Sequence, residues 1–277
     1  MKPAAFAYRT VETVEEAVAA LAELGDDAKV LAGGQSLVPL LNLRLARPSA
    51  LVDIGRIASL SGISANGVLR LGATTRQADA LRSQLVSSRA PLLAEALRHV
   101  GHPATRSRGT VGGSIAHADP AAELPAVLLA LDGEAIVTSG TAERSIPAAA
   151  LFLGPFTTTL GEGELLTELR LGDPPAGARH GFAEIARRRG DFALAGAAVV
   201  VAPGHARVAL FAVGPSAFRA AEAERALLDG AGAAEAAALA AAAAEPSGDA
   251  HATAAYRREA VRVATLRALL AAGVPGG

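Results

Sequence analysis

Residues 29–36, Lys-Val-Leu-Ala-Gly-Gly-Gln-Ser, and residues 110–114, Thr-Val-Gly-Gly-Ser, are the two stretches that decide the fold of this chain. Each places a hydroxyl residue shortly after a glycine pair, and the first pair follows a predicted strand at Ala28–Ala32. Glycine has no Cβ, so its backbone can turn sharply and approach a ligand closely. Successive N–H groups in such a turn form a concave site that attracts phosphate oxygens. Two such turns in separate units suit a diphosphate, and hence a dinucleotide, lying between the units.

Neither glycine pair is specific by itself. Gly-Gly-polar sequences are common in ordinary turns, and the chain contains 29 glycines. The surrounding residues form neither a G-x-G-x-x-G fingerprint nor a Walker A loop, which argues against a Rossmann or P-loop fold. Gly-x-Ser-x-Gly is missing around Ser36 and Ser114, which argues against an α/β-hydrolase nucleophile. The residues alone therefore leave a phosphate site and an ordinary turn both open.

The composition excludes several other classes of site. The chain is 51% hydrophobic and 19% charged, as expected for a packed globular protein. Its net charge is −1 without a basic stripe, which argues against nucleic-acid binding. It has no cysteine, so it cannot itself hold a disulfide or a thiolate-bound iron–sulfur cluster. The N-terminus lacks a signal-peptide core, and no stretch reaches the ~18 apolar residues of a membrane span. We therefore expect a cytoplasmic protein.

Turn and capping signals divide the chain into units. Thr13 and Glu16 form a predicted capping box that opens a helix ended by Gly25, and Asn66-Gly67 predicts a hairpin. Asp173–Gly177, with two prolines, is the clearest linker. We therefore expect a region at residues 1–172, with subdomains of about 1–57 and 58–172, followed by a domain at 178–277.

Three further expectations concern local structure. His102–Ser114 reads as an irregular loop. Asp119 reads as the N-cap of a helix that runs through Leu131, with Pro120 in its first turn. One alanine-rich helix is expected at approximately Ala217–Ala243.

Taken together, several segments resemble a known family. Lys29–Ser36, Leu51-Val-Asp-Ile54 and Thr110-Val-Gly-Gly-Ser-Ile-Ala-His-Ala-Asp-Pro-Ala-Ala-Glu-Leu-Pro125 are similar to the medium, FAD-binding subunit of the xanthine and carbon monoxide dehydrogenases. Ala186–Ala193 resembles the segment that opens the C-terminal domain of that family. The similarity spans almost the whole chain in the expected order. It implies an α+β protein, with an α/β FAD-binding region of the PCMH/vanillyl-alcohol-oxidase type followed by an α+β C-terminal domain.

The resemblance also implies which residues bind FAD, without covalent attachment. Lys29, Val30, Leu31, Ala32, Gly33, Gly34, Gln35 and Ser36 would wrap the pyrophosphate, and Thr110, Val111, Gly112, Gly113 and Ser114 would form the second wall, with both glycine pairs donating backbone hydrogen bonds. Glu123 would accept hydrogen bonds from ribose hydroxyls. Leu165 or Leu166 would pack near the adenine or the flavin, and Phe192 would stack on the isoalloxazine. Ser114 stands where many relatives have Asn or Asp, and Phe192 where some have Tyr.

The function implied is electron transfer within a larger enzyme. In the family, a large subunit oxidises the substrate at a molybdenum cofactor, and a small subunit carries two [2Fe-2S] clusters that pass electrons to the FAD of the medium subunit. The FAD then delivers them to an external acceptor. The resemblance implies a dimer of such heterotrimers, with no catalytic acid or base and no metal ligands in this chain. A freestanding FAD-dependent oxidoreductase of the same fold superfamily is the alternative.

Overall fold

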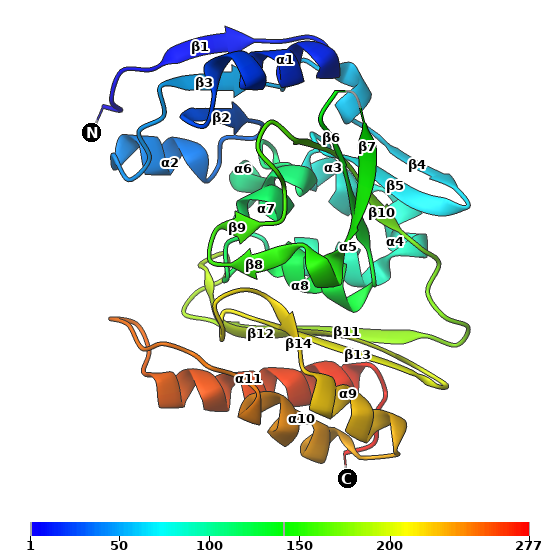
Figure 1. Cartoon of the computed structure of the whole chain (residues 1–277). Helices are drawn as coiled ribbons and strands as arrows, with labels where there is room; N and C mark the ends of the chain where they lie inside the picture. The colour runs from blue at the N-terminus through cyan, green and yellow to red at the C-terminus, as the bar shows by residue number, and fades with distance from the viewer. Residues whose placement is uncertain (1, 141, 277) are drawn as a thin grey trace.

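The computed structural model describes residues 2–140 and 142–276, which form α/β units stacked one on another (Figure 1). A parallel sheet near the N-terminus lies at one end of the molecule. An antiparallel sheet with short helices follows, and a second antiparallel sheet covered by helices lies at the other end. We call these the first, middle and third units. The predicted α+β architecture is confirmed.

The first unit is a parallel sheet in the order β1-β3-β2. Its elements are β1 (Ala7–Thr10), α1 (Val14–Leu24), β2 (Ala28–Leu31), α2 (Leu37–Asn42) and β3 (Ala50–Asp53). Because β2 and β3 run parallel in register, their last residues, Leu31 and Asp53, are partners at the carboxyl edge of the sheet. This edge is where open parallel sheets bind ligands.

Helix α1 begins where the capping signal predicts. The Thr13 hydroxyl accepts the N–H of Glu16 at 3.1 Å. The Glu16 carboxylate accepts the N–H of Glu12 at 2.8 Å, one residue before the cap itself. Gly25 (φ 70°) ends the helix in a conformation that favours glycine.

The middle unit is an antiparallel sheet in the order β4-β5-β10-β6-β7, packed against short helices. Its strands are β4 (Ile63–Asn66), β5 (Val68–Gly72), β6 (Glu134–Thr138), β7 (Glu143–Pro147) and β10 (Leu165–Leu171), with a separate pair β8 (Phe152–Gly154) and β9 (Thr157–Thr158). Its helices are α3 (Gln77–Arg82), α4 (Gln84–Arg89), α5 (Pro91–Leu97), α6 (Pro103–Arg106), α7 (Val111–His117) and α8 (Glu123–Ala130), with short turns η1 (Ala58–Leu60) and η2 (Ala148–Ala150).

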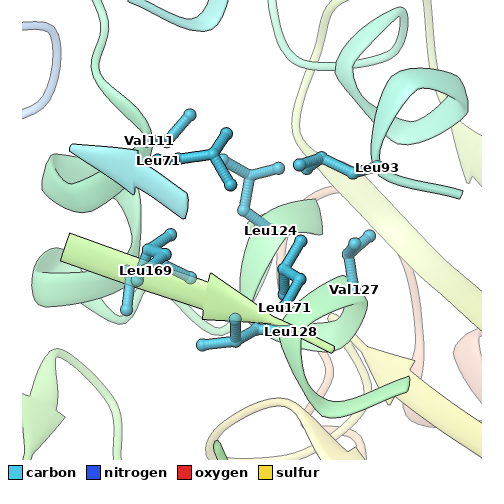
Figure 2. Close-up of a pocket in the computed structure, with 9 residues that line it drawn as sticks. Leu71, Leu93, Val111, Leu124, Val127, Leu128, Leu169 and Leu171 are labelled. Atoms are coloured by element: carbon cyan, nitrogen blue, oxygen red, sulfur yellow. The ribbon is translucent and has the colours of Figure 1, made fainter. Parts of the chain in front are cut away.

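Apolar side chains from β5, β10, α5, α7 and α8 converge in the core of the middle unit (Figure 2). They leave a cavity of about 10 Å³ whose lining residues are all leucine, isoleucine or valine. That volume suits at most about one water molecule, and the lining offers no polar partner. The cavity is therefore part of the core, and its packing fixes where α7 lies.

The third unit is an antiparallel sheet in the order β11-β12-β13-β14, covered by helices on its outer face. Its elements are β11 (Arg179–Ala186), β12 (Ala193–Ala202), β13 (His205–Phe211), β14 (Phe218–Arg219), α9 (Ala221–Leu228), α10 (Ala233–Ala242) and α11 (Ala254–Ala271). Its inner face contributes Phe182, Ala198 and Phe211 to the same buried cluster as the middle unit. The two units therefore share a core. Residues 172–178 join them without helix or strand, as predicted around Asp173–Gly177.

The structure corrects three local predictions. The supposed irregular loop at His102–Ser114 contains α6 and the start of α7. Asp119 does not cap a helix, because its carboxylate accepts the N–H of Ala121 in a local turn, and α8 begins only at Glu123. The alanine-rich helix expected at approximately Ala217–Ala243 is broken into α9 and α10, with Gly230 (φ 94°) between them.

Candidate functional site

The first glycine pair forms a turn whose backbone donors have no protein partner. Strand β2 ends at Leu31, the chain turns through Ala32–Ser36, and α2 follows at once. Within the described part of the chain, none of the N–H groups from Ala32 to Ser36 donates to a protein acceptor. Gly34 adopts φ 71°, which favours glycine over other residues. Exposed N–H groups clustered in such a turn are suited to phosphate oxygens.

Gly33 lies against the backbone of the middle unit. A Cβ at this position would lie 2.5 Å from the carbonyl oxygen of Arg108 and 2.9 Å from Cα of Gly109. Neither neighbour is a side chain that could rotate away. The absence of a side chain at Gly33 therefore lets the turn of the first unit meet the loop before α7.

The second glycine pair differs from the expectation that both pairs present free donors. Gly112 donates its N–H to the carbonyl of Ala73 at 3.0 Å, and Gly113 donates to the hydroxyl of Thr110 at 3.1 Å. Ser114 donates to the carbonyl of Thr110 at 3.2 Å. These donors are already used to cap and anchor α7. Among the described residues, the buried N–H of Thr110 is the donor of this segment that has no protein acceptor.

The glycines of the second pair instead permit close packing. A Cβ on Gly112 would lie 2.6 Å from Cβ of Ala73, and a Cβ on Gly113 would lie 2.6 Å from the Thr110 hydroxyl oxygen. The same Cβ on Gly113 would lie 3.8 Å from Cβ of Ala32. The structure therefore brings the two predicted segments together. The first presents N–H groups without protein acceptors, whereas the second mainly allows α7 to pack closely.

A groove of about 480 Å³ opens beside the first turn. Its volume lies within the roughly 300–1,000 Å³ of small-molecule sites. The lining residues are Tyr8, Leu31, Ala32, Gly33, Gly34, Gln35, Val38, Pro39, Asp53 and Arg108. Five of these, Tyr8, Val38, Pro39, Asp53 and Arg108, were not predicted as site residues. Asp53 lies within the Leu51–Ile54 segment that carries the family resemblance, whereas no sequence signal pointed to Tyr8 or Arg108.

Glu123 is the first residue of α8, and its carboxyl is buried, with 7% of the residue exposed. The pKa of this carboxyl is raised to about 8, mainly by burial and to a smaller extent by the charges of Glu184 and Asp119. The backbone N–H of Glu123 and the charge of Arg106 act in the opposite direction, but they do not offset the burial. At neutral pH the unliganded chain therefore holds this carboxyl mainly in its protonated form.

The remaining predicted residues occupy different environments. Leu165 is buried in the core of the first unit, and Leu166 is buried in the core shared by the middle and third units. Phe192 is 70% exposed, after the turn between β11 and β12. In that turn, a Cβ on Gly190 would lie 2.6 Å from the ring of His102, so the turn packs on the loop that leads to Arg108. The proposed contacts of these three residues with a cofactor stay predictions.

The described residues contain neither a candidate metal site nor a candidate membrane-spanning helix. Among residues 2–140 and 142–276, no group of three or more His, Cys, Asp or Glu side chains is arranged to hold a metal ion. None of the helices in these ranges is long and apolar enough to cross a membrane.

The fold and the turn match a specific class of protein. A family model described as the FAD binding domain in molybdopterin dehydrogenase matches residues 4–174, and one described as the CO dehydrogenase flavoprotein C-terminal domain matches residues 180–272. This chain belongs to the FAD-binding medium subunits of the molybdenum hydroxylase family. It is thus a subunit of an FAD-dependent oxidoreductase.

Individual relatives support this membership. The chain is 42% identical over 280 residues to the 6-hydroxypseudooxynicotine dehydrogenase complex subunit alpha of Paenarthrobacter nicotinovorans, covering 97% of this chain and 95% of the relative. It is 41% identical over 225 residues to the carbon monoxide dehydrogenase medium chain of Hydrogenophaga pseudoflava, covering 79% and 78%. A solved structure of carbon monoxide dehydrogenase from Hydrogenophaga pseudoflava superimposes with a TM-score of 0.94 over 99% of both chains, at 41% identity. The structure of quinoline 2-oxidoreductase from Pseudomonas putida 86 superimposes with a TM-score of 0.90 at 36% identity, again over 99% of both chains.

The residues of this chain fit the cofactor of that family. The N–H groups of the first turn lack protein acceptors, and the adjoining groove has the volume of a ligand site. Ala32–Ser36 would hold the diphosphate of FAD, with Thr110 on the facing wall. The cofactor supplies the redox chemistry when bound, and the protein positions it.

Proposed function

We propose that this chain relays electrons, through its bound FAD, from a [2Fe-2S] subunit to an external acceptor. Substrate oxidation then takes place at a molybdenum cofactor in a separate large subunit. The observation that carries this proposal is the turn at Ala32–Ser36, whose unpartnered N–H groups line a ligand-sized groove in a chain of this family. The names of relatives support it, because they are subunits or medium chains of dehydrogenases.

The chain's own residues position the cofactor in this scheme. The amide turn binds the diphosphate, and α7, anchored through Gly112 and capped by Thr110, holds the facing wall rigidly. No acid or base is required of the chain, because electron relay needs no proton transfer from the protein at a substrate. Leu165, Leu166 and Phe192 remain proposed contacts of the adenine or the flavin.

The proposed assembly is a dimer of heterotrimers, a heterohexamer, located in the cytoplasm. We propose that exposed leucines take part in the contacts with partner chains. Leu43 and Leu45, after α2, are 56% and 74% exposed, and Leu153 is 66% exposed. The small iron–sulfur subunit and the large molybdenum subunit are the partners we infer.

Isolation of the native complex tests this proposal. We expect mass spectrometry and metal analysis to find this chain with a cysteine-rich iron–sulfur chain, a larger molybdenum-containing chain and one FAD per copy. A yellow chain that purifies alone and oxidises small substrates without partners would favour the freestanding oxidoreductase. A colourless chain that does not take up FAD would overturn both functions.

Replacement of Glu123 tests its proposed contact with ribose. Glu123→Ala should weaken FAD binding by about 1–3 kcal/mol, the usual cost of leaving a buried hydrogen-bonding group without its partner. Titration of the flavin-free chain with FAD, followed by flavin fluorescence, measures this change. Unchanged affinity would remove Glu123 from the site.

A further inference from the structure

Arg108 supplies a cation to the groove from the middle unit. The other residues that line the groove belong to the first unit. The carbonyl of Arg108 accepts a hydrogen bond from the guanidinium of Arg76 and lies against Gly33, so its backbone is fixed. In the described residues, the Arg108 guanidinium itself has no hydrogen bond and no carboxylate partner. An arginine without a counter-charge beside unpartnered N–H groups is a second donor for an anion.

Tyr8 and Asp53 line another part of the same groove with an aromatic ring and a carboxylate that are hydrogen-bonded to each other. The Tyr8 hydroxyl donates to one carboxylate oxygen of Asp53, and the N–H of Gly55 donates to the other at 2.8 Å. Both oxygens are thus engaged, and the Asp53 side chain is fixed. The Tyr8 side chain is held by this bond, yet the residue is 56% exposed. A held aromatic ring with an exposed face is suited to stacking on a planar group.

The strand order sets the polarity of the groove. The amide turn follows β2, Asp53 ends β3, and Tyr8 lies on β1, in a sheet ordered β1-β3-β2. The groove therefore passes from the turn and Arg108, across Asp53, to Tyr8. Positive charge and free N–H groups lie at one end, and the Asp53 carboxylate repels an anion from the other. An uncharged, planar group is favoured beside Tyr8.

We propose that Arg108 is the cationic contact of the FAD diphosphate and that Tyr8, held by Asp53, stacks on the adenine at the other end of the same groove. This inference rests on the proposed function and assigns two binding residues to it. The amide turn and Arg108 grip the diphosphate from two units, so cofactor binding also joins those units.

The test compares ligands that carry different parts of the dinucleotide. Affinities of the flavin-free full chain for FAD, ADP and adenosine are measured by fluorescence and calorimetry. Arg108→Gln should weaken FAD and ADP about tenfold at low salt, the effect of losing one charge-assisted hydrogen bond, and should leave adenosine unchanged. The loss should shrink in 1 M salt, because salt screens exposed charges. Arg108→Lys should recover part of the affinity.

Arg267→Gln is the matched control, because Arg267 is an exposed arginine on α11 of the third unit. It should bind all three ligands as the wild-type chain does. Equal losses for adenosine and ADP in Arg108→Gln would indicate a structural effect and overturn the Arg108 assignment. Wild-type affinity of Arg108→Gln for FAD and ADP would overturn it as well. If the wild-type chain binds no FAD, the proposed function itself fails.

Tyr8→Leu tests the nucleoside end separately. Loss of the ring should weaken adenosine, ADP and FAD by a similar factor, on the order of tenfold for base–aromatic stacking. The salt dependence of FAD binding should stay that of the wild-type chain, since no charge is removed. Unchanged adenosine affinity would overturn the assignment of Tyr8.

Discussion

Gly33→Val is expected to abolish stoichiometric FAD binding. The new Cβ would lie 2.5 Å from the Arg108 carbonyl oxygen and 2.9 Å from Cα of Gly109, and both neighbours are backbone atoms. The first and middle units would have to separate at the turn that we propose binds the diphosphate, and this turn would be displaced with them. Absorbance of the purified chain gives the flavin content, and titration with FAD gives the residual affinity.

Valine at other glycines shows whether the loss of FAD binding is specific to the two glycine turns or follows from any glycine-to-valine change. Gly113→Val should also strip FAD, because its Cβ would lie 2.6 Å from the Thr110 hydroxyl that caps α7. Gly172→Val is the control, since no atom lies within 4 Å of a Cβ built there. Circular dichroism should show that all three variants keep the fold. Stoichiometric flavin in both Gly33→Val and Gly113→Val would contradict the assignment of the two turns.

Glu123→Gln is expected to abolish the pH dependence that Glu123 imposes on the free energy of unfolding. The folded chain holds this carboxyl with a pKa of about 8, against 4.5 for an unperturbed glutamate. Between these values the unfolded chain releases the proton and the folded chain keeps it. The free energy of unfolding therefore falls as pH rises from 4.5 to 8, by at most about 1.4 kcal/mol per pH unit. The amide of glutamine does not titrate in this range, so the variant lacks this loss of stability.

Urea unfolding of the flavin-free chain between pH 5 and pH 8 measures this effect. The free energy of unfolding of the variant should increase relative to that of the wild-type chain as pH rises, by up to a few kcal/mol at pH 8. Glu164→Gln is a control of opposite sign, because its hydrogen bond from Arg144 lowers the pKa of the Glu164 carboxyl. That variant should be less stable at neutral pH and approach the wild-type chain as pH falls. Parallel curves for Glu123→Gln and the wild-type chain would show that Glu123 is not a buried, protonated group.

Capping and turn residues in the sequence predicted local structure correctly where a few neighbouring residues determine the backbone conformation. The Thr13–Glu16 pair placed the start of α1, and Asn66-Gly67 placed the hairpin of β4 and β5, where Gly67 adopts φ 78°. They failed at Asp119, because Ala118 adopts φ 48° and the chain makes a turn before α8. The Pro120 carbonyl accepts the N–H of Ala212 from the third unit, so this turn is fixed by packing between units.

The sequence by itself determined the family, the order of the units and the two glycine segments that meet between units, because glycine pairs and strand ends are properties of short stretches. Only the tertiary structure decided which of these segments keeps N–H groups free to bind a ligand. The amides at Ala32–Ser36 lack protein acceptors, whereas those of Gly112 and Gly113 are used within their own unit. It also brought Tyr8, Asp53 and Arg108 into one groove. The physical reason is that hydrogen-bond partners and groove walls come from residues far apart in the chain, whose meeting depends on how the units pack.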